Sequence, residues 1–169
     1  MSLSTLMRDF FLFLNERVDY VVLRNSAGLP EQCHSRDVDI AIRRKDYRAI
    51  KKDLLSLLEK NNWKLITYWR SGRLITWVVA SLDGVMQWDF FFDTSVFGIR
   101  LLDVEQLLAG ARVQEGSVPV KISSASVEFL DKYLYDRAVG AAYPEKYAQV
   151  RSAVEKDAQV LSVVEKLMG

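Results

Sequence analysis

Three aspartates in two strand-like stretches have the residue type and spacing expected of a catalytic or metal-binding site. Asp37 and Asp39 alternate with apolar residues, and Asp89 stands alone inside an apolar run. Side chains two apart on a strand share a face and lie about 6.6 Å apart along the backbone, so Asp37 and Asp39 project together from one wet face. If the two strands are neighbours, the three carboxylates meet.

Carboxylates held this close repel one another, and each raises the pKa of the others unless a cation neutralises them. Their hard oxygens suit Mg²⁺ or Mn²⁺, which also bind water and phosphate oxygens. Phosphoryl or nucleotidyl transfer is the chemistry that such a site favours. The residues therefore predict a metal site at Asp37, Asp39 and Asp89, with a solvated, purely structural strand face as the alternative.

The apolar periodicity predicts the elements that position these residues. Helices are expected from Ser4 or Thr5 as cap to about residue 17, over 47–58, as a turn or two at 104–109, over 127–140, and from Pro144 onward through Tyr147, Val150, Val154, Leu161 and Val164. Strands are expected at 20–23, 37–42, 63–69, 74–80, 85–92, 96–99 and 118–122, the last at a sheet edge. Asp83-Gly84 indicates a hairpin.

This order of elements predicts an α+β fold, a mixed β-sheet flanked by helices with a helical C-terminal part. We expect residues 1–122 to form the α/β core and residues 123–169 to pack on it as helices. The first two strands, joined by a polar loop, are expected to lie side by side.

Composition narrows the possible functions. The chain has 169 residues, of which 50% are hydrophobic and 27% charged, as is usual for a globular domain. Its formal net charge of +1 argues against binding long nucleic acid mainly by charge. No apolar run is long enough to cross a membrane. With a single cysteine, Cys33, no internal disulfide is possible, and the cytoplasm is the expected compartment.

The two acidic stretches resemble the nucleotidyltransferase superfamily of the polymerase-β type. Asp37-Val38-Asp39 is similar to its Asp-x-Asp strand, and Trp88-Asp89-Phe90 to the strand that carries its third aspartate. The stretch from Tyr20 to Asn25, followed by Ser35 to Ile40, looks like a bacterial branch of minimal or polysaccharide-cluster-associated nucleotidyltransferases. The resemblance covers roughly residues 19–93.

The resemblance implies an enzyme that uses Mg²⁺, or Mn²⁺, to move a nucleotide from an NTP to a hydroxyl acceptor. Asp37 and Asp39 would bind both ions, and Asp89 would bind the catalytic ion and help to deprotonate the acceptor. The candidate substrate-binding residues are Arg24, Asn25, Ser26, Ser35 and Arg36. The chain departs from the family at Arg24-Asn25-Ser26, where a Gly-Ser turn is usual; an arginine there would bind phosphate oxygens bidentately.

Other interpretations remain open at this point. His34 and Cys33 fit an ordinary loop, and Lys132 and Arg137, which lie where relatives cover the cleft, fit an exposed helix face. A catalytically inactive nucleotide- or partner-binding module of the same fold is the main alternative function. A glycosyltransferase with an Asp-x-Asp motif is a further one, although the small size and the separate Asp89 strand count against it. The acceptor, the base and the oligomeric state are not indicated.

Overall fold

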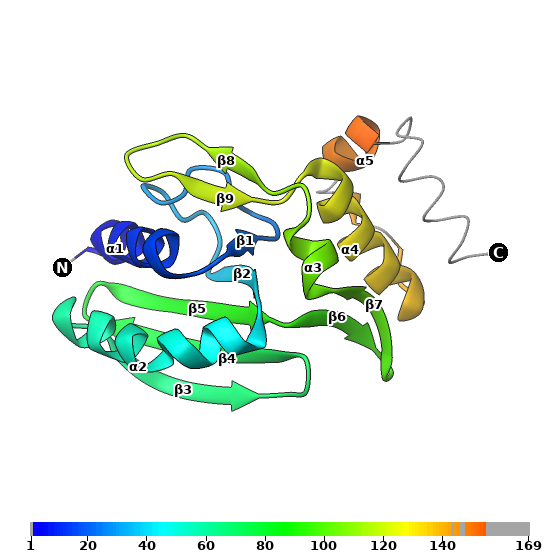
Figure 1. Ribbon diagram of the computed structural model, residues 1–169. Helices are drawn as coiled ribbons and strands as arrows, with labels where there is room; N and C mark the ends of the chain where they lie inside the picture. The colour runs from blue at the N-terminus through cyan, green and yellow to red at the C-terminus, as the bar shows by residue number, and fades with distance from the viewer. Residues whose placement is uncertain (1, 143, 146–147, 155–169) are drawn as a thin grey trace.

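A mixed β-sheet forms the centre of the computed structural model, which describes residues 2–142, 144–145 and 148–154 (Figure 1). Within that part of the chain the sheet has seven strands, in the spatial order β3 (Lys64–Arg70), β4 (Leu74–Ser81), β5 (Gly84–Phe91), β2 (Asp37–Ile42), β1 (Tyr20–Val22), β9 (Val120–Ile122) and β8 (Arg112–Gln114). A separate hairpin consists of β6 (Asp93–Val96) and β7 (Ile99–Asp103). The helices are α1 (Leu3–Arg17), α2 (Arg44–Lys60), α3 (Val104–Leu108), α4 (Ala125–Ala138) and α5 (Ala148–Val154).

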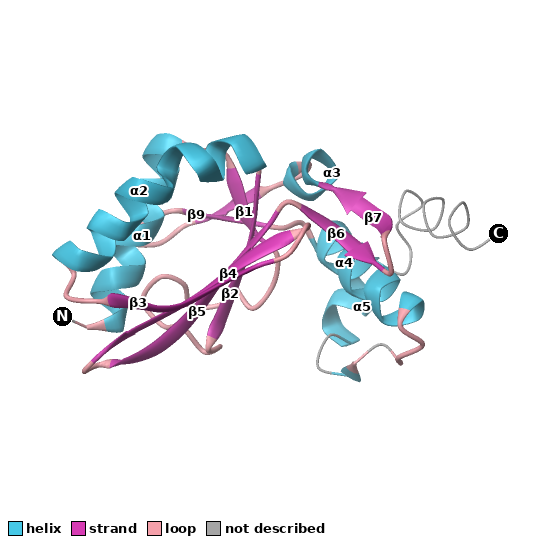
Figure 2. Ribbon diagram, turned by 90° about the horizontal axis from the view of Figure 1, so that it is seen from below, coloured by secondary structure: helices cyan, strands magenta, loops and turns pink. Residues whose placement is uncertain are grey.

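Helices α1 and α2 cover one face of the sheet (Figure 2). Helix α1 begins two or three residues earlier than expected, because the Ser2 hydroxyl caps it by accepting from the Thr5 backbone N–H. Its residue Phe10 is fully buried and stacks on Trp88 of β5, with ring centroids 4.1 Å apart. This layer holds the larger hydrophobic core, and it fixes the back of the strand that carries Asp89.

A second, smaller core lies on the opposite face, beside β1 and where β2 and β5 end. Its buried residues come from these strands, from β4 and β7, and from α3, α4 and α5: Val21, Leu23, Ala41, Leu74, Phe91, Leu102, Leu107, Phe129, Leu130, Leu134 and Val154. Helices α4 and α5 therefore pack on the face of the sheet opposite α1 and α2. None of the described helices lies over the rest of that face, at β3 and β4 (Figure 2).

The strands that carry the three aspartates are direct neighbours. β2 and β5 pair in parallel with Asp37 opposite Gln87 and Asp39 opposite Asp89. β3, β4 and β5 form the expected meander, with Thr76 of β4 opposite Asp89. β1 pairs antiparallel with β2, as expected for the first two strands.

Three details of the sequence interpretation are wrong. Residues 96–99 are not a strand: Phe97 and Gly98 have φ of 51° and 81° and form the turn between β6 and β7. The strand near 118–122 is not at an edge, because β8 pairs with β9 on its outer side. The described helix that carries Val150 and Val154 is α5, and it begins at Ala148 rather than at Pro144.

The observed architecture is the α+β fold that the order of elements predicts. β9 ends at Ile122 and α4 begins at Ala125, while the division into residues 1–122 and 123–169 stays a prediction. The expected helix positions Tyr147, Leu161 and Val164 lie outside the described residues. Among the described helices, none has the length and apolar character that a bilayer span requires.

Candidate functional site

Asp37, Asp39 and Asp89 lie on the same face of the sheet, opposite the face that α1 and α2 cover. Asp39 and Asp89 are paired positions on neighbouring strands, and Asp37 is two residues before Asp39 on β2. Side chains paired across neighbouring strands in register point to the same side. The continuation of this row passes through Thr76 of β4 to Trp69 of β3. The topology thus places all three predicted metal ligands on one face of two neighbouring strands.

The side chains on the aspartate face are less exposed to solvent than the alternating pattern predicts. Asp39 is only 2% exposed and Asp89 only 8%. The expectation of one fully wet strand face is therefore wrong. The reason is tertiary: the second core packs on this face two residues further along, at Ala41 and Phe91, and Arg24 lies against Asp39.

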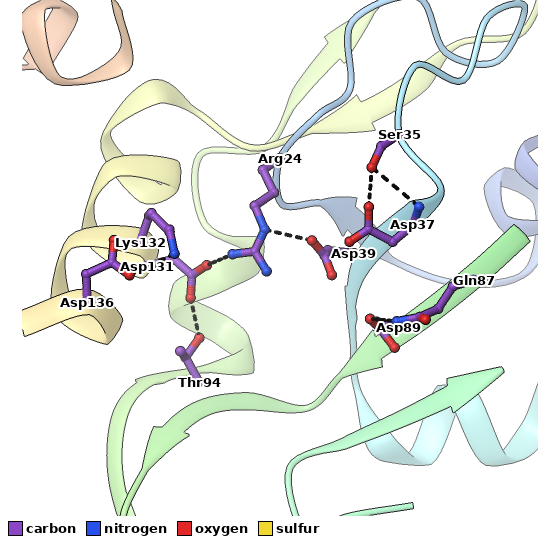
Figure 3. A network of polar contacts seen from close by, with 10 residues as sticks. All are labelled: Arg24, Ser35, Asp37, Asp39, Gln87, Asp89, Thr94, Asp131, Lys132 and Asp136. Carbon is purple, nitrogen blue, oxygen red and sulfur yellow. Dashed lines mark hydrogen bonds and ion pairs between the residues drawn. The ribbon is translucent and has the colours of Figure 1, made fainter. Parts of the chain in front are cut away.

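Arg24 is the partner that compensates the buried charge of Asp39. Its Nε donates to Asp39 Oδ2 at 2.7 Å, and its Nη1 donates to Asp131 Oδ2 of α4 at 3.2 Å (Figure 3). The other carboxylate oxygen of Asp131 accepts from the Thr94 hydroxyl of β6 at 2.7 Å. A single guanidinium therefore connects β2 to α4.

The other two aspartates have neutral partners. The Ser35 hydroxyl donates to Asp37 Oδ1. Asp89 accepts from the Thr76 hydroxyl at 2.5 Å through Oδ1 and from Gln87 Nε2 at 2.8 Å through Oδ2. These bonds hold both carboxylates in place without neutralising them.

The residues present fit a divalent cation in donor type and in charge. The network in Figure 3 contains five aspartates and two basic residues, so three negative charges are left over when all are ionised. Such an excess in a poorly hydrated place favours binding of a further cation. Yet the side chains do not form a ready coordination site: in the part of the chain that the structure describes, no three His, Cys, Asp or Glu residues are grouped closely enough to hold a metal ion.

The electrostatic cost of this arrangement is visible at Asp39. Burial raises the pKa of its carboxyl from 3.8 to about 6; Arg24 opposes that shift, and the charges of Asp37 and Asp89 add to it. Asp39 therefore takes up a proton in the folded protein at a pH where the unfolded chain has already lost it.

This shift predicts how stability depends on pH. Because the folded pKa exceeds the unfolded one, the Asp39 contribution is fully present below about pH 4 and is lost as pH rises through about 6, by about 3 kcal/mol. We expect Asp39→Asn to remove this part of the fall in the free energy of unfolding. Urea titrations of both proteins between pH 4 and 8, without divalent ions, measure it. Parallel pH curves for the two proteins would contradict the expectation.

The loop residues predicted to bind substrate lie around Asp37 and Arg24. Asn25 has a φ of 55°, so asparagine supplies the left-handed conformation that a glycine turn would otherwise provide. Asn25 and Ser35 line a cavity of about 320 Å³ together with Ala27 and His34. Ser26 contributes its carbonyl, which accepts from Gln114 Nε2. Arg36 has an exposed side chain, and its carbonyl accepts from the Gln87 N–H.

A second cavity, of about 180 Å³, adjoins Arg24 and contains residues that the sequence interpretation missed. Its lining includes three cations, Arg24, Arg73 and Lys132, together with Asp131 and Tyr135. Lys132 is not on an exposed face as expected; it lines this cavity and pairs with Asp136 at 2.7 Å, whereas Arg137 is exposed. Arg73, in the β3–β4 turn, and Asp131, on α4, carry no local sequence signal, because their roles come from contacts made far along the chain.

Comparison with known proteins shows which known fold this chain resembles. No protein-family model matches the chain, and no curated protein matches it in sequence. Its structure is similar to the crystal structure of "a putative nucleotidyltransferase (TM1012)" from Thermotoga maritima, with a TM-score of 0.51, 16% sequence identity, and coverage of 90% of this chain and 91% of that one. The chain has a nucleotidyltransferase-like fold. At this level of identity the similarity concerns architecture alone, and the chemistry has to be argued from the residues.

Proposed function

We propose that this chain is a metal-dependent nucleotidyltransferase that moves a nucleotide from an NTP to a hydroxyl acceptor. The observation that carries the proposal is the parallel register that places Asp39 opposite Asp89, with Asp37 beside them. The nucleotidyltransferase-like fold and the excess negative charge of the network support it. We further propose that the chain belongs to the bacterial minimal or polysaccharide-cluster-associated branch, on its stretches around Arg24 and Asp37.

The three aspartates would hold Mg²⁺ or Mn²⁺, which supplies neutralisation of the phosphates and of the leaving pyrophosphate. Arg24, Arg73 and Lys132 would bind the β- and γ-phosphates in the cationic cavity. Asp89 would accept a proton from the acceptor hydroxyl. An acceptor would approach Asp89 across β4 and β3, where Trp69 is 54% exposed.

The direct test measures products. With Mg²⁺, an NTP and a panel of hydroxyl acceptors, the proposed enzyme releases pyrophosphate and adds a nucleoside monophosphate to one acceptor. Release of a nucleoside diphosphate from a nucleotide sugar would instead indicate glycosyl transfer. If all four NTPs bind with Mg²⁺ but none is turned over with any acceptor, the catalytic proposal is wrong.

Arg73 provides a specific prediction about the cavity. We expect Arg73→Ala to weaken Mg²⁺–NTP binding between about tenfold and a hundredfold, because a charge-assisted hydrogen bond contributes about 1.5–3 kcal/mol. Titration calorimetry measures the dissociation constants. Arg70→Ala is the matched control, since Arg70 is exposed on β3 and does not line the cavity. Equal effects of the two substitutions would remove Arg73 from the proposed phosphate site.

A second candidate function is a non-catalytic nucleotide- or partner-binding module of this fold. One observation favours it: a guanidinium already pairs with Asp39, where an active enzyme needs a metal ion. The two candidate functions make different predictions about the contact between Arg24 and Asp39. The module predicts that Arg24 stays on Asp39 in the presence of Mg²⁺.

A further inference from the structure

Arg24 serves two buried carboxylates from separate parts of the fold. Asp39 on β2 and Asp131 on α4 have side chains that are 3% and 7% exposed, and both accept from the same guanidinium. One positive charge is thus shared between two negative charges that have almost no water around them. Neither carboxylate is fully neutralised, which distinguishes this pair from an ordinary buried ion pair.

The contacts of Arg24 with Asp39 and with Asp131 are not equivalent. The Asp39 contact is the shorter, at 2.7 Å, but Asp39 stands beside two further carboxylates, Asp37 and Asp89. Asp131 has only the 3.2 Å contact with Arg24, yet it also accepts from the Thr94 hydroxyl. The surroundings of Asp39 therefore carry more uncompensated negative charge than those of Asp131. A divalent ion would bring two positive charges there, whereas the guanidinium brings one.

The cationic cavity offers a second position for the Arg24 side chain. Its side chain is 23% exposed and lines the cationic cavity beside Arg73 and Lys132. A long side chain at the border of a cavity can move its guanidinium by rotamer changes, without moving the backbone. The contact with Asp131 lies on the cavity side, since Asp131 lines the same cavity.

We propose that Arg24 is an exchangeable counter-ion. In the ion-free protein it neutralises Asp39; when a divalent cation binds at Asp37, Asp39 and Asp89, Arg24 leaves Asp39 and turns into the cationic cavity, where it meets phosphate. Arg24 thereby competes with the metal for Asp39 and links metal entry to the formation of the phosphate site. The inference rests on the metal site of the proposed function but not on the transfer reaction.

Metal affinity tests the competition directly. Mn²⁺ titrated calorimetrically into the full chain without nucleotide should bind Arg24→Gln at least about tenfold more tightly than the wild type, which corresponds to about 1.4 kcal/mol. Arg43→Gln is the matched control, because Arg43 follows the other end of β2 and pairs with Glu105 and Asp19. Asp39→Asn in the Arg24→Gln background should remove the gain. Unchanged or weaker Mn²⁺ binding by Arg24→Gln would overturn the proposal.

A measurement on the wild type does not depend on whether the variant folds. The Nε–H of Arg24, hydrogen-bonded to Asp39, should give a slowly exchanging NMR signal that shifts and exchanges faster with solvent as Mg²⁺ is added. If the Asp39 and Asp89 signals respond to Mg²⁺ while the Arg24 Nε–H does not, Arg24 stays in place and the exchange is refuted. Absence of any Mg²⁺ or Mn²⁺ binding to either protein refutes it as well. Exchange without nucleotide transfer would refute the proposed function alone.

Discussion

Replacing Asp37 and Asp39 together by asparagine should abolish Mg²⁺-dependent nucleotidyl transfer, with a fall in kcat/KM of about 10³-fold or more. The expected size follows from the several kcal/mol that metal ions contribute to phosphoryl-transfer transition states. Asparagine keeps the shape of the side chains but removes the charges that would hold the ion. Pyrophosphate release, measured over a range of NTP concentrations at several Mg²⁺ concentrations, gives kcat/KM.

The fold should survive these substitutions. Asp39 has a raised pKa because its charge is costly where it lies, so removing the charge does not remove a net source of stability near neutral pH. Asp53→Asn is the matched control, since Asp53 is half exposed and pairs with Arg17 on the helix side of the sheet. Transfer that persists in the folded double variant would show that these aspartates do not hold the catalytic ion.

Replacing Phe10 by alanine should lower the free energy of unfolding by about 3–5 kcal/mol, the usual cost of truncating a buried aromatic side chain. Phe10 is fully buried and stacks on Trp88, one residue before Asp89. The cavity left behind would lie against the strand that positions the aspartate. Urea denaturation monitored by circular dichroism measures the change, and the smaller substitution Phe10→Leu covers the case in which the alanine variant does not fold.

Phe97→Ala is the control for this loss. The residue type is the same, but Phe97 is 84% exposed in the β6–β7 turn, so its removal should change the free energy of unfolding by no more than about 0.5 kcal/mol. A cost for Phe10→Ala of under about 1 kcal/mol would mean that α1 does not contribute the packing described for it.

The sequence was informative where structure follows from local pattern. The alternation in β5 places Trp88 and Phe90 in the core and Asp89 on the other face, as observed. The Asp83-Gly84 turn predicts the hairpin that brings Thr76 beside Asp89. The α+β fold followed from the order of such elements.

What was missed depends on contacts between distant residues. Phe97 at positive φ makes a turn inside an apolar run, where periodicity predicts a strand. β8 is short and mostly exposed, so it shows no apolar alternation, and its pairing makes β9 an interior strand. Likewise, nothing near Asp39 in the sequence indicates that Arg24 and Asp131, the latter 107 residues after Arg24, would share its charge.

The unequal burial of the tryptophans gives the protein a built-in optical reporter. Trp63, Trp77 and Trp88 are at most 1% exposed, whereas Trp69, in the same strand-crossing row as Asp89, is 54% exposed. A water-soluble quencher such as acrylamide therefore reaches chiefly one indole. Loss of that quenching on adding a compound identifies molecules that settle over β3 and β4, before any product is known.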